Sequence, residues 1–211
     1  YACVGTAPLE IRLLLAVMGG AWGLRLGWHL WLRNWGRPED FRYAQFRKDW
    51  GEQVNVKMFW FFQFQNLFTL MLSASAFLVV AYRKDTAPYW AMGLAMVIWL
   101  ISVIGEGIAD AQMEAFRRNP ANKGKVCRDG LWRYSRHPNY FFETVHWLAY
   151  VPLAVGAPYG WATLAAPVVM AFLLTKLSGM PLLEKEMSAR KPGYADYVAK
   201  TSALIPWPPK A

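Results

Sequence analysis

The sequence has few acidic residues, few histidines and almost no cysteine. Its 211 residues contain 14 Asp and Glu against 23 Lys and Arg, with 3 His and 2 Cys. Two cysteines cannot build a disulfide-stapled fold, and the histidines have no partners at the spacing of a zinc site. The only Gly-x-Gly, Gly105 to Gly107, follows an apolar run and lacks the third glycine of a Rossmann fingerprint. We therefore expect no metal site and no Rossmann domain.

Long hydrophobic runs are what the chain does have. Apolar residues make up 55% of it, aromatic residues 16%, and there are twelve tryptophans. At ~20 residues per crossing, the second, third and fifth of five apolar stretches are long enough, or nearly so, to span a bilayer. The predicted spans are residues 9–32, 58–82, 88–109, 140–155 and 161–177. We therefore predict an all-α, polytopic membrane helix bundle of five spans that forms one domain over residues 1–211.

Two of these stretches are unusual. The first carries Arg12, Arg25 and His29, so it should pack inside the bundle or line a cavity. The fourth is short and broken by Pro152, so we expect half of a tight helical hairpin with the fifth. The chain also begins with Tyr1 rather than Met, and we expect further helices upstream.

The basic residues predict an orientation, because cytoplasmic loops carry an excess of Lys and Arg. They concentrate in the first and third connections and in the tail, residues 178–211, whereas the second connection has only Arg83 and Lys84. We therefore predict a multi-pass protein of a bacterial inner membrane or an organelle membrane, with its C-terminus on the cytoplasmic or matrix side. Cys3 and Cys127 then lie on opposite sides. The net charge of +9 is mostly this bias, so we expect membrane lipids and not nucleic acid as partners.

The segment from Gly130 to Glu143 is the most informative part of the chain. It reads Gly-Leu-Trp-Arg-Tyr-Ser-Arg-His-Pro-Asn-Tyr-Phe-Phe-Glu and leads into the fourth apolar stretch. Asn139, Glu143 and His146 share one helical face at i, i+4 and i+7. Polar and ionisable side chains inside a membrane usually face a protein interior or a cavity. The alternative is a helix start with a basic membrane-surface anchor.

A second polar stripe ends the third span. Glu106, Asp110, Glu114 and Arg117 follow one another at i, i+4, i+8 and i+11. Asp110 and Glu114 could pair with Arg117 or Arg118 as a purely structural feature. The stripe could equally hold the ribose or amide of a nucleotide, with Arg117 on a phosphate.

The first connection should contain a short interfacial helix. Glu39 and Asp40 favour a helix start after the turn at Gly36. Trp50, Gly51 and Asn55 should end it before the second span. Amide side chains in that span either hold helices together or line a pocket; they are Gln63, Gln65 and Asn66.

Several blocks together resemble the bacterial-type branch of the steroid 5α-reductase family, from about Trp22 onward. They are Glu39-Asp40-x-Arg42-Tyr43, Asn119-Pro120-Ala121-Asn122-x-Gly124-Lys125, Gly130 to Phe141, Ser178-Gly179-x-Pro181-Leu182-Leu183-Glu184 through Pro192-Gly193-Tyr194, and Ser202-Ala203-x-Ile205-Pro206-Trp207-Pro208-Pro209. The resemblance implies a seven-helix membrane bundle, of which this chain holds the last five helices. It also implies NADPH-dependent reduction of an enone carbon–carbon double bond.

The resemblance implies roles for individual residues. Asn139 and Glu143 would hold the nicotinamide end of NADPH, and Asp110 and Arg117 would contact the adenine nucleotide and phosphate. Further cofactor contacts would come from Asn34, Arg37, Arg136 and Tyr197. The family's ketone-polarising Glu belongs upstream and its Tyr aligns near Gly23, while Glu184 or Lys185 replaces an arginine. The remaining candidate catalytic donors are His29, Tyr43 and His146.

Two other functions are compatible with the sequence. Membrane methyltransferases of the isoprenylcysteine carboxyl type use S-adenosylmethionine and share Arg-His-Pro-x-Tyr, a following Glu, and a Tyr-x-x-Tyr like that of Tyr194 and Tyr197. Asn139 and the block from Glu39 to Tyr43 favour the reductase. The chain could also be a non-catalytic subunit of a larger membrane complex.

We expect the substrate to be a flat, apolar enone that enters laterally from the lipid. The first two spans present many aromatic side chains and few charges, a lining suited to polycyclic or isoprenoid molecules. These residues are Trp28, Trp31, Phe59, Phe61, Phe62 and Phe64. The alternative is that they are ordinary lipid-facing and interfacial residues.

Overall fold

The structure is a computed structural model that describes residues 1–36, 39–177 and 179–210. All regular structure in these residues is helical, which confirms the predicted all-α class. The α-helices are α1 (Leu9–Asn34), α2 (Phe41–Trp50), α3 (Val54–Ala81), α4 (Tyr89–Arg118), α5 (Pro138–Leu148), α6 (Ala165–Phe172), α7 (Met180–Arg190) and α8 (Tyr194–Lys200). Shorter turns of helix connect them: η1 (Gly51–Gln53), η2 (Pro120–Asn122), η3 (Gly130–Arg133), η4 (Pro152–Ala154), η5 (Gly160–Leu164) and the π-helical η6 (Leu173–Leu177).

Within the part of the chain that the structure describes, three helical segments are long and apolar enough to cross a membrane: Tyr43–Ala81, Tyr89–Arg118 and Gly160–Arg190. They contain the second, third and fifth predicted spans. The first stretch forms the 26-residue helix α1, as expected. The fourth is shorter than predicted, because α5 ends at Leu148 and Pro152 starts a separate turn. Five crossings and a seven-helix family fold stay predictions.

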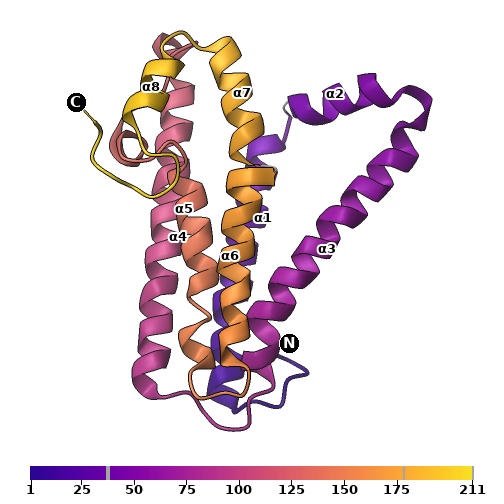
Figure 1. Ribbon diagram of the computed structural model, residues 1–211, viewed down its shortest axis with the longest axis vertical. Helices are drawn as coiled ribbons and strands as arrows, with labels where there is room; N and C mark the ends of the chain where they lie inside the picture. Colours follow the sequence, from indigo (N-terminus) through magenta and orange to yellow (C-terminus); the bar gives the residue numbers. More distant parts are fainter. Residues whose placement is uncertain (37–38, 178, 211) are drawn as a thin grey trace.

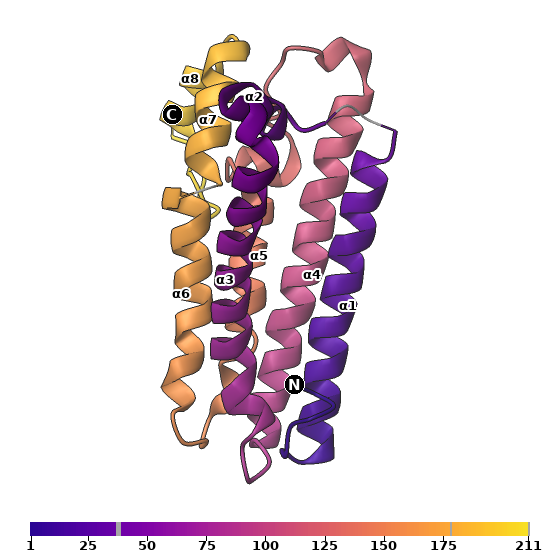
Figure 2. The same ribbon diagram turned by 90° about the vertical axis from the view of Figure 1, so that its right-hand side faces the viewer.

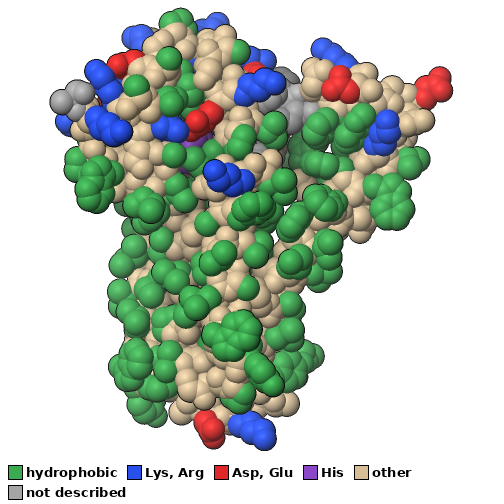
Figure 3. Space-filling view, in the orientation of Figure 1, with side chains coloured by type: hydrophobic (Ala, Val, Ile, Leu, Met, Phe, Trp, Pro, Cys, Tyr) green, Lys and Arg blue, Asp and Glu red, His purple; other side chains and the backbone are tan. Residues whose placement is uncertain are grey.

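The long helices run side by side along the longest axis of the molecule (Figures 1 and 2). One end carries α2, α7, α8 and the C-terminus, and we call it the tail end. The N-terminus and the connection from α3 to α4 lie at the other end, the loop end. Hydrophobic side chains cover the length of the bundle, while Lys and Arg side chains gather near the tail end (Figure 3). This distribution agrees with the charge bias of the sequence.

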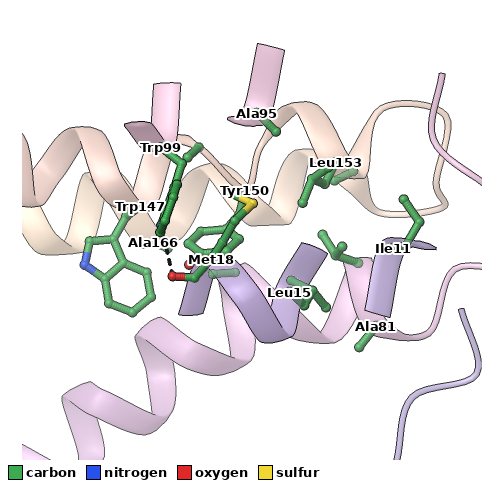
Figure 4. Packing of buried hydrophobic residues seen from close by; sticks show 14 of the residues in the cluster. Ile11, Leu15, Met18, Ala81, Ala95, Trp99, Trp147, Tyr150, Leu153 and Ala166 are labelled. Atoms are coloured by element: carbon green, nitrogen blue, oxygen red, sulfur yellow. Dashed lines mark hydrogen bonds between the residues drawn. The ribbon is translucent and has the colours of Figure 1, made fainter. Parts of the chain in front are cut away.

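A hydrophobic core joins α1, α3, α4 and α5 toward the loop end. Its members include the fully buried Ile11, Met18, Tyr150 and Leu153. Trp99 lies at the centre, where its Nε1 donates to the Met18 carbonyl oxygen at 2.9 Å (Figure 4). Because a buried indole N–H needs a partner, this bond fixes the register of α1 against α4.

Gly105 allows α4 and α5 to pack closely. A Cβ atom at this position would lie 2.3 Å from Cε1 of Phe142, which is far inside van der Waals contact. Glycine inside a helix normally weakens it by roughly 0.5–1 kcal/mol relative to alanine. The contact with Phe142 explains why glycine stands at position 105, whereas Gly107 has nothing within 4 Å of its Cβ position.

The arm, which comprises α2 and residues 54–71 of α3, diverges from the bundle toward the tail end (Figure 1). Most described side chains of this part of α3 are exposed, whereas Leu72, Ala76, Val80 and Ala81 are buried. The arm is held together by aromatic contacts, such as Phe46 stacked on Trp50 with ring centroids 4.6 Å apart. It therefore joins the bundle through the loop-end half of α3.

Helix α2 begins where the sequence predicts. The amides of Tyr43 and Ala44 donate to the carbonyl oxygen of Asp40 at 3.0 and 3.1 Å, and the helix ends at Trp50. Asn55, which we expected to help end it, lies in the first turn of α3.

Candidate functional site

Arg136 organises the tail end. Its side chain is only 10% exposed and donates to both carboxylate oxygens of Glu184, at 2.8 Å from Nε and 3.2 Å from Nη2. Its Nη1 donates to the carbonyl oxygens of Val198 at 3.1 Å and Thr201 at 2.6 Å, and its backbone N–H donates to Ser202. One side chain thus joins the start of α5 to α7, to α8 and to the C-terminal segment.

Neighbouring groups extend this network. His137 Nε2 lies 2.9 Å from Glu184 Oε1, and Ser135 Oγ donates to the Leu204 carbonyl oxygen at 2.8 Å. The Tyr197 hydroxyl donates to the carbonyl oxygens of Trp132 and Ser135. Burial raises the pKa of the Tyr197 hydroxyl, so it stays a neutral donor. We call the bonds of Ser135, Arg136, His137, Glu184 and Tyr197 the tail network.

The tail network encloses one side of a cavity of about 490 Å³. This volume is in the range of small-molecule sites. Six of the eight residues predicted to hold the cofactor line it, although they come from α1, α4, α5, α8 and the segment before α5. They are Asn34, Asp110, Arg117, Arg136, Asn139 and Tyr197. The other two are Arg37, which lies outside the described residues, and Glu143, which lies outside the described lining of the cavity.

The inner end of the cavity is acidic and faces α1. Arg25 Nη2 lies 2.9 Å from Asp110 Oδ2, and Arg25 Nη1 lies 2.9 Å from Glu106 Oε1. His29 Nε2 is 3.8 Å from Asp110. The sequence allowed an ion pair of Asp110 with Arg117 or Arg118 on its own helix. That pairing was wrong, because Asp110 pairs with Arg25 of α1. Glu114 pairs with Arg118 at 3.2 Å, as the sequence also allowed.

The outer part of the cavity is basic. Arg117 and Lys191 both line it, and a second pocket of about 480 Å³, lined by Lys123, Lys125 and Arg128, shares Val126 with it. Lys191 Nζ donates to the Lys125 carbonyl oxygen at 2.8 Å. Burial, and then the charge of Arg117, lower the pKa of Lys191. Cations held this close together make a favourable place for an anionic group.

The three candidate catalytic residues lie in different places. His29 lines the cavity. His146 is 0% exposed, pairs through Nε2 with the Tyr150 hydroxyl at 3.1 Å, and stacks on Trp22 at a centroid distance of 4.3 Å. Tyr43 lies on the arm, where its ring contacts Phe61 and Phe62. The structure therefore brings only His29 to the described cavity wall.

Asn139, Glu143 and His146 do share one face of α5, at increasing depth. Asn139 lines the cavity and its Oδ1 accepts the Tyr140 amide at 3.1 Å. Glu143, one turn further along, accepts from Trp147 Nε1 at 3.3 Å. The shared face thus leads from the cavity into the bundle.

Sequence reasoning missed Trp22 and Lys191 as residues of this region, and it missed the partners of Arg25. Lys191 lines the cavity, and Trp22 stacks on His146; neither had a signal of its own in the sequence. The stretch that carries Arg25 was predicted to pack inside the bundle or line a cavity, but its partners Glu106 and Asp110 lie on another helix.

Comparison with known proteins identifies the family. The chain matches the family described as "Protein of unknown function (DUF1295)" over residues 3–201, and it belongs to that family.

Among curated proteins, the chain is similar to the "Probable O-methyltransferase ustE" of Ustilaginoidea virens, with 33% identity over 104 residues. The match covers 49% of this chain and 36% of that protein, so the chain spans about a third of the length of this relative. No solved structure matches the chain.

Proposed function

We propose that this protein is a membrane-embedded reductase that uses NADPH to reduce a carbon–carbon double bond conjugated to a carbonyl group in an apolar substrate. The observation that carries the proposal is the cavity at the tail end. Its lining includes Asn34, Asp110, Arg117, Arg136, Asn139 and Tyr197, which the resemblance to the steroid 5α-reductase family assigns to one cofactor. They are spread over more than 160 positions of the chain, and folding brings them to one wall.

The distribution of charge supports a cofactor with several phosphates. Arg117 and Lys191 line the outer part of the main cavity, and Lys123, Lys125 and Arg128 line the pocket beside it. NADPH carries a pyrophosphate and a 2′-phosphate, whereas S-adenosylmethionine carries a sulfonium cation. Lys and Arg side chains bind phosphate oxygens through charge-assisted hydrogen bonds. The basic mouth therefore favours NADPH over the methyl donor.

The chain's own residues would divide the work along the cavity. Arg117 and Lys191 would hold phosphates at the outer part, and Asn139 and Glu143 would orient the nicotinamide near the inner end. NADPH, when bound, supplies the hydride, and the protein contributes alignment and exclusion of water. Arg136 has most of its donors bound to Glu184, Val198 and Thr201. Its contribution is therefore to hold the cavity wall in place.

The apolar substrate would reach the cavity from the lipid. The arm exposes large side chains, among them Phe59, Phe62 and Phe64, and it includes part of one of the three segments long enough to span a membrane, which supports contact of this surface with lipid. The charge bias then puts the tail end, with the cavity mouth, on the cytoplasmic or matrix side. NADPH would enter from that side.

Isothermal titration of the detergent-solubilised protein with NADPH and with S-adenosylmethionine tests the proposal. We expect NADPH to bind more tightly, and Arg117→Ala to weaken it about tenfold or more, since a charged hydrogen bond contributes about 1.5–3 kcal/mol. The matched control is Arg118→Ala, whose side chain is 79% exposed and pairs with Glu114. Tighter binding of S-adenosylmethionine would overturn the reductase.

The second candidate is a membrane methyltransferase, which the similarity to the probable O-methyltransferase of Ustilaginoidea virens favours. In that case the same cavity would take S-adenosylmethionine. Transfer of a labelled methyl group to a lipophilic acceptor, without NADPH oxidation by any apolar enone, would establish this alternative.

A further inference from the structure

A group of buried polar atoms lies beyond the inner end of the cavity, between α1, α4 and α5. Trp22 Nε1, Arg25 Nη1, Glu106 Oε2 and His146 Nδ1 are buried and have no hydrogen-bond partner among the described residues. Because buried polar atoms in folded proteins are nearly always hydrogen-bonded, orphaned atoms from three helices in one place indicate a binding function.

Two contacts join these side chains across the helices. The Trp22 indole stacks on the His146 ring at a centroid distance of 4.3 Å and an interplanar angle of 17°. Arg25 Nη1 is 2.9 Å from Glu106 Oε1, close enough for an ion pair although the N–H is not aligned for a hydrogen bond. Trp22 and Arg25 are three residues apart on α1, so their two donor groups lie on the same face of this helix.

Arg25 is held rigidly. Glu106 and Asp110, one helical turn apart on α4, each contact a different terminal nitrogen of its guanidinium. A guanidinium carries five N–H donors in a fixed plane, so these two contacts orient the group and leave donors for a ligand. Ion pairs of this kind are costly to build away from water, and preorganised donors are what a developing negative charge requires.

We propose that Trp22 Nε1 and the Arg25 guanidinium bind the carbonyl oxygen of the apolar substrate, with Glu106 and Asp110 as positioning residues. This inference rests on the proposed reductase function. Trp22 stacks on His146, which shares one face of α5 with Asn139 and Glu143, and Arg25 pairs with Asp110, which lines the cofactor cavity. The carbonyl would therefore lie next to the place where hydride is delivered.

This position has a chemical consequence. A hydride supplied by NADPH would add to the β-carbon, the alkene electron pair would form an enolate with its charge on the bound oxygen, and water in the cavity would protonate the α-carbon. Hydrogen bonds to the oxygen are stronger in the enolate than in the ketone, so they lower the barrier. Removal of one such donor typically reduces kcat about 10²–10³-fold.

The decisive variant is Trp22→Phe, which removes the N–H and keeps an aromatic ring against His146. We expect kcat with cholest-4-en-3-one to fall at least about 10²-fold, while the NADPH dissociation constant stays within about twofold of wild type. The matched control is Trp99→Phe, whose lost N–H binds the Met18 carbonyl oxygen in the core. It should lower thermal stability and leave kcat nearly unchanged.

A second readout does not depend on turnover. Cholest-4-en-3-one labelled with carbon-13 at the carbonyl, bound with NADP⁺ to the protein in nanodiscs, should show a carbonyl infrared band at lower frequency than in lipid alone. Trp22→Phe and Arg25→Lys should move the band back toward the lipid value, because lysine keeps the charge but loses the planar fork. Trp99→Phe should keep the shifted band.

The results separate this inference from the proposed function. A shifted band in wild type that Trp22→Phe and Arg25→Lys leave in place would overturn the inference alone, as would wild-type kcat in Trp22→Phe. Absence of a shifted band in wild type that binds NADPH would also overturn it. Failure of wild type to bind NADPH would overturn both.

Discussion

Two parts of the tail end, the tail network and the arm, are built in different ways. The tail network, which borders the cavity, joins α5, α7 and α8 through charged and backbone hydrogen bonds, among them Arg136 to Glu184, Val198 and Thr201. The arm is held by ring contacts between α2 and α3, and most of its described side chains are exposed. The tail network is therefore preorganised, whereas the arm has few contacts that restrict it.

This difference matches the two ligands that the proposed reaction needs. A phosphate-bearing cofactor is the same in every cycle, so fixed charges and backbone groups suit it. An apolar substrate must pass from lipid into the bundle, and elements with few buried contacts open at the lowest free-energy cost. We therefore expect the tail network to determine stability and cofactor affinity, and the arm to determine access of the substrate.

The largest effect should come from Arg136→Ala. It removes the N–H groups that donate to Glu184, Val198 and Thr201, and it leaves the partly buried Glu184 carboxylate with His137 as its one partner among the described residues. Breaking a buried charged network typically costs about 3–5 kcal/mol, so thermal unfolding in detergent should shift strongly. Arg128→Ala is the control, since its pair with Asp196 is largely exposed. Equal shifts in the two variants would contradict a special role for the tail network.

Gly105→Ala should be the next most damaging change, because the added Cβ would lie 2.3 Å from the Phe142 ring. Overpacking of this kind costs about 1–3 kcal/mol. Gly107→Ala, two residues along α4 with nothing within 4 Å of its Cβ, should be neutral or slightly stabilising. Adding Phe142→Leu should restore stability to Gly105→Ala and should not stabilise Gly107→Ala. The measurement is the thermal unfolding midpoint of the two single variants and the two double variants.

Glu143→Gln should weaken NADPH binding more than Glu114→Gln does. Glu143 lies inside the bundle, where its carboxylate accepts from Trp147, whereas Glu114 pairs with the exposed Arg118. Loss of a buried charged partner costs about 1–3 kcal/mol, and titration calorimetry measures the difference. Equal affinities in the two variants would remove Glu143 from the cofactor site.

A change in the arm should be milder for the fold. Phe46→Leu removes the stack on Trp50 and the contact with Phe61, and aromatic pairs contribute about 0.5–1.5 kcal/mol beyond burial. We expect a small shift in unfolding, unchanged NADPH affinity and an altered KM for the apolar substrate. Loss of NADPH binding would show that the arm belongs to the cofactor wall.

The smallest effect concerns pH. Burial lowers the folded-state pKa of Lys191 below its ordinary value of 10.5, so the folded protein binds its proton less well than the unfolded chain does. Stability should therefore rise as pH increases through the window between the folded pKa and 10.5. Lys191→Met should flatten this rise in unfolding experiments, while Lys123→Met should leave it in place.

The sequence predicted the outline of the fold well, and six of the residues that it assigned to a cofactor line one cavity. Pro138 and Pro152 bound α5, Asp40 precedes α2, and Gly193, with φ of +80°, precedes α8. These six residues were assigned through the chain's resemblance to a family, and they form about a third of the cavity lining. The sequence could not show which of His29, His146 and Tyr43 lines the cavity. How deep a residue lies in the bundle, and whether it lies on the arm, depend on how the helices pack.

The local signals along the chain determined by themselves roughly where the long helices lie and which stretches are apolar enough to cross a membrane. These properties depend on backbone hydrogen bonding and on transfer of side chains from water, which act over a few residues. Only the tertiary structure decided that Asp110 pairs with Arg25, 85 residues away. It also decided that Arg136 closes the tail against Glu184 and that Trp22 stacks on His146. Such contacts depend on the register of one helix against another, which is set by close packing at places such as Gly105 and Trp99.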